Sequence, residues 1–210
     1  MADKKTANTK PLIITLAIII GVIAIIIIAT RLSKPNYDEY TYNNYPFEPS
    51  DTLWITWAEK DGQPYRIPFY HHPTELEDIV AEPGLEQLLL FASKEKPETV
   101  VYITLDPELQ SRAVVAAVEI SRLTGDRYNL LNLETHGALT RLPDEQIANT
   151  QNPIITCNDA NHDTIVIWMT LTNANFIHAE GNCITLEARS DEDMVRVADR
   201  FAYMIIGIMK

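Results

Sequence analysis

Glycine is scarce in this chain, with only 7 glycines among 210 residues. Loops that bind phosphates or nucleotides use glycine where the backbone must approach the ligand closely. The sequence contains neither the G-x-x-x-x-G-K-[ST] nor the G-x-G-x-x-G pattern, and it lacks the G-x-S-x-G and H-E-x-x-H patterns of hydrolases. We therefore expect no cofactor, and the sequence favours a binding protein over an enzyme.

Positive charge is also scarce. The chain has 17 Lys and Arg against 29 Asp and Glu, which gives a net charge of −12. Residues 1–30 hold three Lys and one Asp, so the rest of the chain has 14 basic and 28 acidic residues and a net charge of −14. Such an acidic domain repels phosphate backbones and anionic lipid headgroups. We expect no nucleic-acid partner.

Charged residues are absent from Pro11–Thr30, which reads PLIITLAIIIGVIAIIIIAT. As a helix this stretch is about 30 Å long, which matches the hydrocarbon thickness of a bilayer. It predicts one transmembrane helix at residues 11–30, after a basic N-terminal tail at residues 1–10. The apolar run is longer than that of a secretory signal, and Arg31 follows directly, so we expect the segment to remain as an anchor.

Basic residues flank the predicted span on both sides. Lys4, Lys5 and Lys10 precede it, and Arg31 and Lys34 follow it. This small excess favours a cytoplasmic N-terminus by the positive-inside rule. We expect a single-pass protein of the cell membrane with residues 31–210 on the extracytoplasmic side.

Residues 31–51 are rich in Tyr, Pro and Asn and poor in aliphatic side chains, which predicts a tether. Its tyrosines could lie in the lipid headgroup layer or pack on the following domain, and both interpretations remain open. Residues 52–210 are predicted to form a single globular α/β domain, because a chain of this length buries one full hydrophobic core.

Two strands are predicted on either side of Asp61-Gly62, because this dipeptide favours the type I′ turn of a hairpin. In the second strand, within Gln63–Tyr70, Pro64 and Pro68 have the same parity, so both missing N–H groups lie on one side. That side is predicted to be an unpaired sheet edge. A protein partner from the cell envelope could add a strand there.

A βαβ unit with parallel strands is predicted next. Thr99–Leu105 is apolar at nearly every position, which is typical of a strand covered on both faces. Asp106 is predicted to cap a helix that runs to Thr124 before Gly125, and a second strand is predicted at Tyr128–Leu133. Asp106 also lies at the carboxyl edge of the first strand, where α/β sheets bind ligands, so a functional role is the alternative to capping.

The rest of the chain predicts a β-meander and a final helix. Ser190 and Asp193 form a capping box that begins this helix. Its apolar residues become nearly continuous towards the end, so we expect that end to be buried. The predicted fold class is α/β, in the sense of an α+β mixture. After the transmembrane helix it has a mixed sheet with the βαβ unit, the β-meander and the C-terminal helix.

The two cysteines, Cys157 and Cys183, lie at the ends of predicted strands. Outside the cell such a pair most simply forms one disulfide, and inside it would be two free thiols. A third alternative is a zinc site, because Cys157, His162, His178 and Cys183 have the spacing C-x4-H-x15-H-x4-C. This spacing is not that of a standard zinc finger, so the disulfide is the main interpretation and no metal is expected.

His71 and His72 form the other histidine cluster. With acidic residues close by at 75–78, they could hold a metal or supply a general base. Adjacent residues at a strand end face opposite ways, so both side chains cannot easily bind one ion. We interpret the pair as an exposed turn, and His136-Gly137 as an ordinary loop.

The chain resembles a group of uncharacterised single-pass membrane proteins from small-genomed archaea of the DPANN lineages. The resemblance covers residues 11–210 and is carried by the leading span and by the stretches YRIPFYHHPTELEDI, VVYITLDPELQSRAVVAAVEI, PIITC, GNCITLEA and DRFAYMIIGIM. That group has no assigned activity. The resemblance therefore implies an anchored, outward-facing domain and assigns no functional residues.

These observations favour a membrane-anchored protein of the cell envelope that acts as a binding or assembly module. This hypothesis rests on the predicted anchor, the predicted tether and the lack of a catalytic sequence pattern. The alternative is a metal-dependent envelope enzyme that uses Cys157, His162, His178 and Cys183.

Overall fold

The computed structural model describes residues 18–26, 40–142 and 152–210, and the chain consists of two units, Met1–Glu39 and Tyr40–Lys210. In the first unit, residues 18–26 are helical and their side chains are exposed. The rest of the predicted span 11–30, the basic tail 1–10 and residues 31–39 of the predicted tether lie outside the described residues. Among the residues that are described, no helix is both long and apolar enough to cross a bilayer.

The second unit begins with residues 40–50, which the sequence predicts as part of the tether. These residues form the short strands β1 (Thr41–Tyr42), β2 (Tyr45–Pro46) and β3 (Glu48–Ser50). Phe47 is buried, and Tyr40, Tyr42 and Tyr45 pack against the hydrophobic core. The folded unit therefore starts about twelve residues before the predicted boundary, and these three tyrosines pack on the domain.

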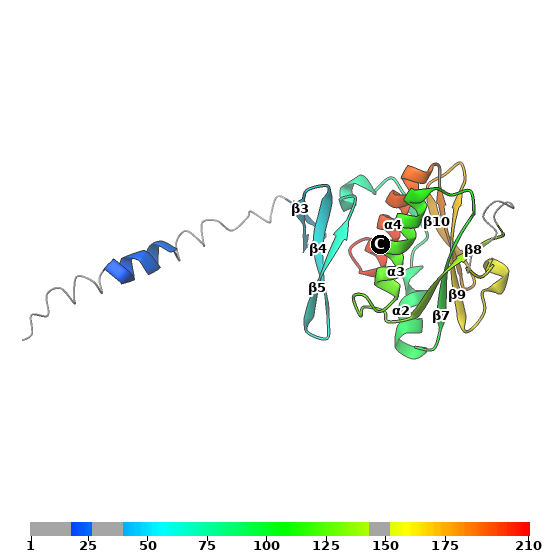
Figure 1. Cartoon of the computed structure of the whole chain (residues 1–210), viewed down its shortest axis with the longest axis horizontal. Helices are drawn as coiled ribbons and strands as arrows, with labels where there is room; N and C mark the ends of the chain where they lie inside the picture. The colour runs from blue at the N-terminus through cyan, green and yellow to red at the C-terminus, as the bar shows by residue number, and fades with distance from the viewer. Residues whose placement is uncertain (1–17, 27–39, 143–151) are drawn as a thin grey trace, which may run out of the picture. The chain divides into compact units, whose positions relative to one another are not determined.

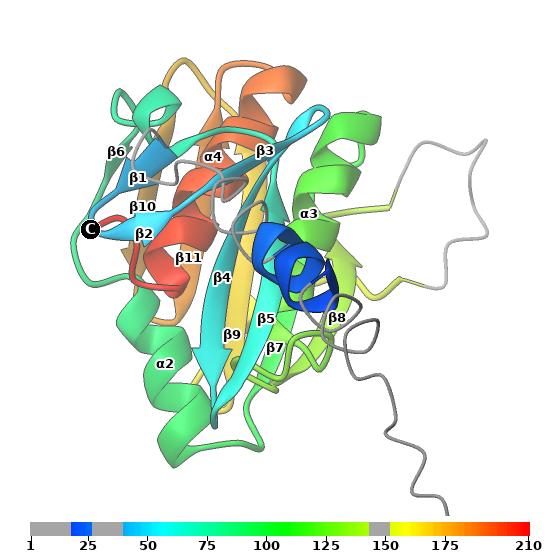
Figure 2. The same cartoon turned by 90° about the vertical axis from the view of Figure 1, so that its left-hand side faces the viewer.

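The folded unit has three layers, with helices between a large and a small sheet (Figures 1 and 2). The large sheet has the strand order β6-β10-β11-β9-β7-β8, and the small sheet has the order β3-β4-β5. The longer elements are β4 (Leu53–Lys60), β5 (Gln63–Phe69), α2 (Glu86–Glu95), β7 (Val100–Leu105), α3 (Ser111–Thr124), β8 (Glu134–Leu139), β9 (Thr164–Leu171), β10 (Phe176–Glu180), β11 (Cys183–Ala188) and α4 (Asp191–Ile205), and the shorter ones are η2 (Pro73–Glu75), β6 (Val80–Ala81) and η4 (Cys157–Asp159). The structure thus confirms a mixed α/β fold with a mixed sheet.

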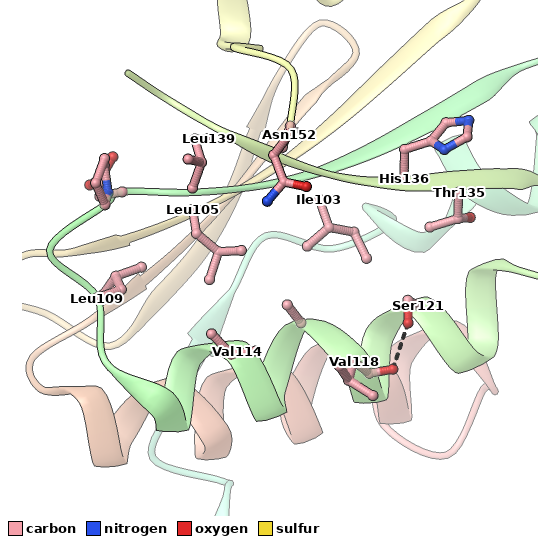
Figure 3. Close-up of a pocket in the computed structure, with 15 residues that line it drawn as sticks. Ile103, Leu105, Leu109, Val114, Val118, Ser121, Thr135, His136, Leu139 and Asn152 are labelled. Atoms are coloured by element: carbon pink, nitrogen blue, oxygen red, sulfur yellow. Dashed lines mark hydrogen bonds between the residues drawn. The ribbon is translucent and has the colours of Figure 1, made fainter. Parts of the chain in front are cut away.

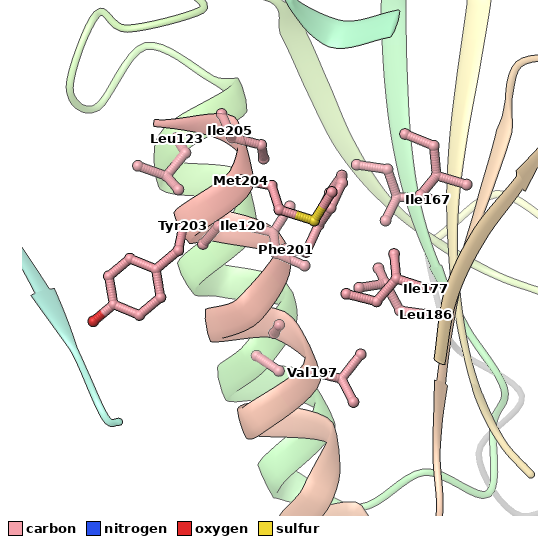
Figure 4. Packing of buried hydrophobic residues seen from close by; sticks show 14 of the residues in the cluster. Ile120, Leu123, Ile167, Ile177, Leu186, Val197, Phe201, Tyr203, Met204 and Ile205 are labelled. Atoms are coloured by element: carbon pink, nitrogen blue, oxygen red, sulfur yellow. The ribbon is translucent and has the colours of Figure 1, made fainter. Parts of the chain in front are cut away.

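Helix α4 is the centre of the core. Figure 4 shows Val197, Phe201 and Met204 pointing towards the large sheet, whereas Tyr203 points to the opposite side. There the Tyr203 ring stacks on Phe69 of β5, with ring centroids 3.9 Å apart. The C-terminal part of α4 is buried on all sides and has no polar face, which explains the nearly continuous apolar run there. The buried core cluster lies within residues 47–209, so this unit has a hydrophobic core of its own.

The hairpin and the start of the last helix follow the sequence prediction. Strands β4 and β5 pair antiparallel, and Asp61 and Gly62 between them have φ of 54° and 75°, as a type I′ turn requires. Strand β5 is at the edge of its sheet, which confirms the unpaired side predicted from its two prolines. Ser190 caps α4 by accepting a hydrogen bond of 3.1 Å from the Asp193 N–H.

The βαβ unit is confirmed, but two of its boundaries differ from the prediction. Strands β7 and β8 are parallel and are joined through α3. The second strand is not at Tyr128–Leu133 but at β8, because Asn129 and Asn132 have φ of 50° and 52° and interrupt an extended chain. Asparagine tolerates this left-handed conformation better than most residues do.

Helix α3 begins at Ser111, so the prediction that Asp106 caps it is wrong. The cap comes from a distant part of the chain. The carboxylate of Asp191, in the first turn of α4, accepts hydrogen bonds of 3.0–3.3 Å from the N–H groups of Gln110, Arg112 and Ala113. A carboxylate satisfies the free N–H groups at a helix start and interacts favourably with the helix dipole.

The predicted β-meander is also wrong. In a meander each strand pairs with its neighbour in sequence, but β11 lies between β9 and β10, parallel to β9 and antiparallel to β10. Five of the six β11 residues are buried, whereas β10 carries half-buried His178 and exposed Glu180. The more apolar strand therefore takes the inner position of the sheet, and the more polar one lies further out.

Candidate binding groove beside strand β8

The two cysteines form a disulfide. Cys157 in η4 and Cys183 in β11 have Cα atoms 5.3 Å apart, and the bond fixes the segment before β9 to strand β11. In this state neither sulfur is a thiolate, which is the form that binds zinc.

The two histidines of the predicted zinc pattern have other neighbours. His162 Nδ1 is 2.6 Å from Asp163, and His178 stacks on Phe176 with its Nε2 atom 3.5 Å from Glu187. No group of three or more His, Cys, Asp and Glu side chains in the described part of the chain is arranged to hold a metal ion.

His71 is half-buried and His72 is buried, so the prediction that the pair is an exposed turn is wrong. His71 Nδ1 is 2.9 Å from the carboxylate of Asp199, which is only 1% exposed. The same oxygen accepts hydrogen bonds from the backbone N–H groups of Tyr70 and His71, and the Tyr203 hydroxyl donates to the His71 carbonyl. Burial raises the pKa of the Asp199 carboxyl. These contacts fasten the end of β5 to α4.

His72 is buried in an aromatic cluster. Its ring centroid is 4.8 Å from those of Phe47 and Trp54, and its Nδ1 atom is 2.8 Å from the Thr74 hydroxyl. Burial lowers the pKa of His72. The Nε2 atom has no hydrogen-bond partner among the described residues. The aromatic contacts give this histidine a structural role.

Asp106 lies at the carboxyl end of β7 and joins three strands of the large sheet. Its carboxylate accepts hydrogen bonds from the Thr140 hydroxyl at 2.7 Å, the Trp168 indole N–H at 3.2 Å and the Thr170 hydroxyl at 2.6 Å. These donors follow β8 or belong to β9. Asp106 is therefore half-buried and held in place by neutral donors, at the edge where parallel sheets bind ligands.

A groove of about 400 Å³ runs between α3 and strands β7 and β8, with Asp106 at its margin. Its volume lies in the range of small-ligand sites, which are mostly apolar with few polar groups. Figure 3 shows the side chains of Ile103 and Leu105 pointing from the sheet towards α3, and His136 pointing away from it. The main apolar lining consists of Ile103, Leu105, Leu109, Val114, Val118 and Leu139.

Asp106 is the acidic residue of the described lining, but its carboxylate bonds to Trp168 and Thr170, which the register of β7 and β9 places on the face of the sheet away from α3. The Ser121 hydroxyl donates to the Val118 carbonyl, and the Thr135 hydroxyl is hydrogen-bonded to Thr124. Asn152 is exposed at the groove, and its side chain makes no hydrogen bond with any residue that the structure describes. No Lys or Arg belongs to the described lining.

Gly137 is the residue that leaves the groove open. It pairs with Ile103 in the register of β7 and β8, so a side chain here would point to the face covered by α3. An added Cβ would meet no atom within 4 Å, and the φ of Gly137 is not positive. Neither backbone conformation nor crowding requires glycine here. Glycine inside a strand often marks the close approach of a ligand.

Sequence reasoning missed this groove, although two signals were present. The sequence predicts an apolar stripe on α3 that includes Ala113, Ile120 and Leu123, and these three residues are buried. Val114 and Val118 lie outside that stripe and are 53% and 42% exposed. Two valines four residues apart form a second apolar face on the helix. Gly137, interpreted as part of a loop, lies inside β8.

No protein-family model matches the chain, and no curated protein or solved structure shows significant similarity to it. The groove is thus defined by its own geometry alone.

Proposed function

We propose that this protein is a membrane-anchored binding module of the cell envelope and that the groove between α3 and β8 is its binding site. The observation that carries the proposal is the open, apolar groove beside Gly137, where Val114 and Val118 are exposed. A ligand that covers exposed apolar surface of this kind gains free energy from its burial. The uncharged stretch at residues 11–30 supports the anchor.

The disulfide supports an extracytoplasmic location for the folded unit. Disulfides persist in oxidising compartments and are rare in the cytosol of most organisms. The Cys157–Cys183 bond and the excess of basic residues before the predicted span favour the same orientation. In this proposal the groove faces the envelope.

The edge of β5 offers less to a partner than the groove does. On its unpaired side Pro64 and Pro68 have no N–H group, and the Tyr70 N–H is bound to Asp199. Prolines at such positions protect a sheet edge against strand addition. We therefore place the partner site beside β8 and not at residues 63–70.

The proposal is tested with Nile red, an uncharged dye whose fluorescence rises in apolar sites, and with the fragment 40–210, which contains the whole core cluster. We expect saturable binding to this fragment and its loss in Gly137→Leu, whose side chain would fill the groove. Leu171→Ser removes an exposed apolar side chain elsewhere and serves as the matched control that keeps binding. Dye binding that Gly137→Leu leaves intact, or no saturable binding, would overturn the assignment of the groove.

A further inference from the structure

We infer that a second site, separate from the groove beside β8, binds a small carboxylate that carries an aromatic ring. The site is a cleft of about 590 Å³ between α2 and the amino ends of β7, β9 and β11, and we name it the α2 cleft. Among the described residues it shares no lining with the groove beside β8, so the inference goes beyond the proposed function and does not depend on it. The residues that carry the inference are Leu88, Phe91, Lys96, Thr99, His162 and Asn182.

Lys96, which follows the last residue of α2, places a positive charge in the α2 cleft. Its Nζ atom is hydrogen-bonded to His162 Nε2. Because an ammonium group only donates, Nε2 accepts, and the proton of the ring lies on Nδ1, which donates to Asp163 at 2.6 Å. The partner of Lys96 is therefore a neutral ring, and no Asp or Glu belongs to the described lining of the cleft. A positive charge without a carboxylate beside it attracts an anionic ligand.

Thr99 supplies a hydroxyl at the same end of the α2 cleft. It directly precedes β7, and strand alternation places it on the same face as Ile103, which is the face that the helices cover. Thr99 is only 2% exposed, and its Oγ1 atom has no hydrogen-bond partner among the described residues. A buried hydroxyl without a partner is unfavourable. The oxygen of a bound ligand would supply the missing hydrogen bond.

The two polar groups fit a head with a single negative charge. The Thr99 N–H donates to the Lys96 carbonyl at 2.9 Å, so the ammonium and the hydroxyl belong to one tight turn. A carboxylate can accept a hydrogen bond from each of them, and charge-assisted bonds of this kind are strong. Phosphate sites use several backbone N–H groups or an Arg cluster instead, and no Arg belongs to the described lining.

The body of the ligand is set by the apolar face of α2. Leu88 and Phe91 are three residues apart and share this face, and Phe91 is 56% exposed. An exposed ring gains from a stacked or edge-to-face contact with a second ring. Phe91 and Lys96 are about 7.5 Å apart along the chain direction at 1.5 Å per residue. A phenyl ring joined to a carboxylate by two methylene groups covers a similar distance.

Two turns form the opposite wall of the α2 cleft. The Asn182 side chain donates a hydrogen bond of 2.6 Å to the Asn161 carbonyl, which connects the turn after β10 with the turn before β9. Asn182 and the neighbouring Gly181 both line the cleft. Their backbone amides are therefore suitable reporters of an occupied site.

The experiment is an NMR titration of residues 40–210 with 3-phenylpropionate. We expect saturable shifts of the Gly181 and Asn182 amide signals. The uncharged 3-phenylpropionamide should bind about tenfold more weakly, because it lacks the charge that Lys96 attracts. 3-Cyclohexylpropionate should also bind more weakly, because it has no aromatic ring to contact Phe91.

Lys96→Gln should remove the preference for the carboxylate over the amide. Lys94→Gln is the matched control, because Lys94 is also a lysine of α2 but lies outside the cleft lining, beside Glu95. This control should keep the preference. If both variants lose it equally, the general charge of α2 attracts the ligand, and the assignment of the site is wrong.

Thr99→Val separates binding from structure, because it removes the hydroxyl and keeps the branched shape. Binding of 3-phenylpropionate should weaken severalfold, whereas the urea midpoint of the free protein should stay unchanged or rise, because the hydroxyl has no partner there. A lower midpoint with unchanged binding would give the hydroxyl a structural role and contradict the inference.

The inference also fails if 3-phenylpropionate causes no saturable shift at Gly181 and Asn182, or if the amide binds as tightly as the carboxylate. Tighter binding of 3-cyclohexylpropionate would overturn the aromatic part. Nile red reports on the groove beside β8 and not on the α2 cleft. Loss of the dye signal in Gly137→Leu with no response to 3-phenylpropionate would therefore support the proposed function and overturn this inference alone.

Discussion

A glycine inside a strand lowers stability, because it loses more backbone freedom on folding than other residues and packs no side chain. Gly137 has no positive φ and no close neighbour that would justify this cost. We predict that Gly137→Val raises the free energy of unfolding by about 0.5–1 kcal/mol. Urea unfolding of residues 40–210 measures this change.

Gly181 provides the matched comparison. It has φ of 58° in the turn between β10 and β11, and an added Cβ would likewise meet no atom within 4 Å. Gly181→Val should therefore lower stability by about 1–2 kcal/mol, because a β-branched residue strains that backbone. Equal effects of the two substitutions would contradict the view that Gly137 is kept for function and not for structure.

The buried imidazole of His72 makes the folded unit sensitive to acid. Burial lowers the pKa of His72 below its usual 6.5, so the unfolded chain binds the proton more readily than the folded chain does. The stability that neutral His72 contributes is complete above about pH 6.5 and is lost as the pH falls towards the lower folded value. We predict a lower free energy of unfolding at pH 5.5 than at pH 7.5, and a smaller difference in His72→Phe.

His136→Gln serves as the control for this pH experiment, because His136 is exposed and outside the aromatic cluster. The control should keep the full difference between pH 5.5 and pH 7.5. If His72→Phe keeps it as well, another group causes the loss of stability in acid.

At the scale of the elements, the start of α3 depends on a residue of α4. Asp191 accepts three hydrogen bonds from the first turn of α3 and lies in the first turn of its own helix. We predict that Asp191→Ala lowers the free energy of unfolding by about 1–2 kcal/mol, because it leaves several N–H groups without a partner. Thermal or urea unfolding checks the value.

The neighbouring Glu192 is the control for Asp191. Glu192 is acidic and exposed, and it also lies in the first turn of α4. In the described structure it accepts no hydrogen bond from the N–H groups at the start of α3. Glu192→Ala should change stability by less than about 0.5 kcal/mol. A similar loss in both variants would assign the effect to the dipole of α4 and not to the cap of α3.

The elements that the sequence predicts well are those specified by local signals. The Asp61-Gly62 turn, the apolar strand β7 and the Ser190 cap depend on residues within a few positions of each other, and all three are confirmed. The cap of α3 and the position of β11 depend on residues far away in sequence. A single sequence gives no signal for such pairings. The sequence therefore predicts Asp106 as the cap of α3, although Asp191 caps this helix.

The groove could not be predicted from the sequence for the same reason. Its lining combines α3, β7, β8 and Asn152, and only the fold brings them together. Gly137 and the valine pair on α3 were visible in the sequence, but their meaning depends on the register that places Gly137 opposite Ile103. The disulfide was predictable because two cysteines allow one intramolecular pair.

At the scale of the whole molecule, the disulfide connects stability with the proposed extracytoplasmic location of the folded unit. Cys157 and Cys183 are 26 residues apart, and on the chain-entropy model their link stabilises the fold by about 3.5 kcal/mol. We predict that both cysteines of the native chain resist alkylation until they are reduced, and that reduction lowers the free energy of unfolding by roughly this amount.

A single cysteine then reports the orientation. In Cys183→Ser the partner Cys157 becomes a free, half-buried thiol. If residues 40–210 are extracytoplasmic, a maleimide that cannot cross membranes labels this thiol in intact cells, because the reagent reaches the folded unit without crossing the membrane. Labelling only by a membrane-permeant maleimide would place the folded unit inside. Free thiols in the wild-type chain would then be expected too, because a reducing cytosol does not maintain such a bond.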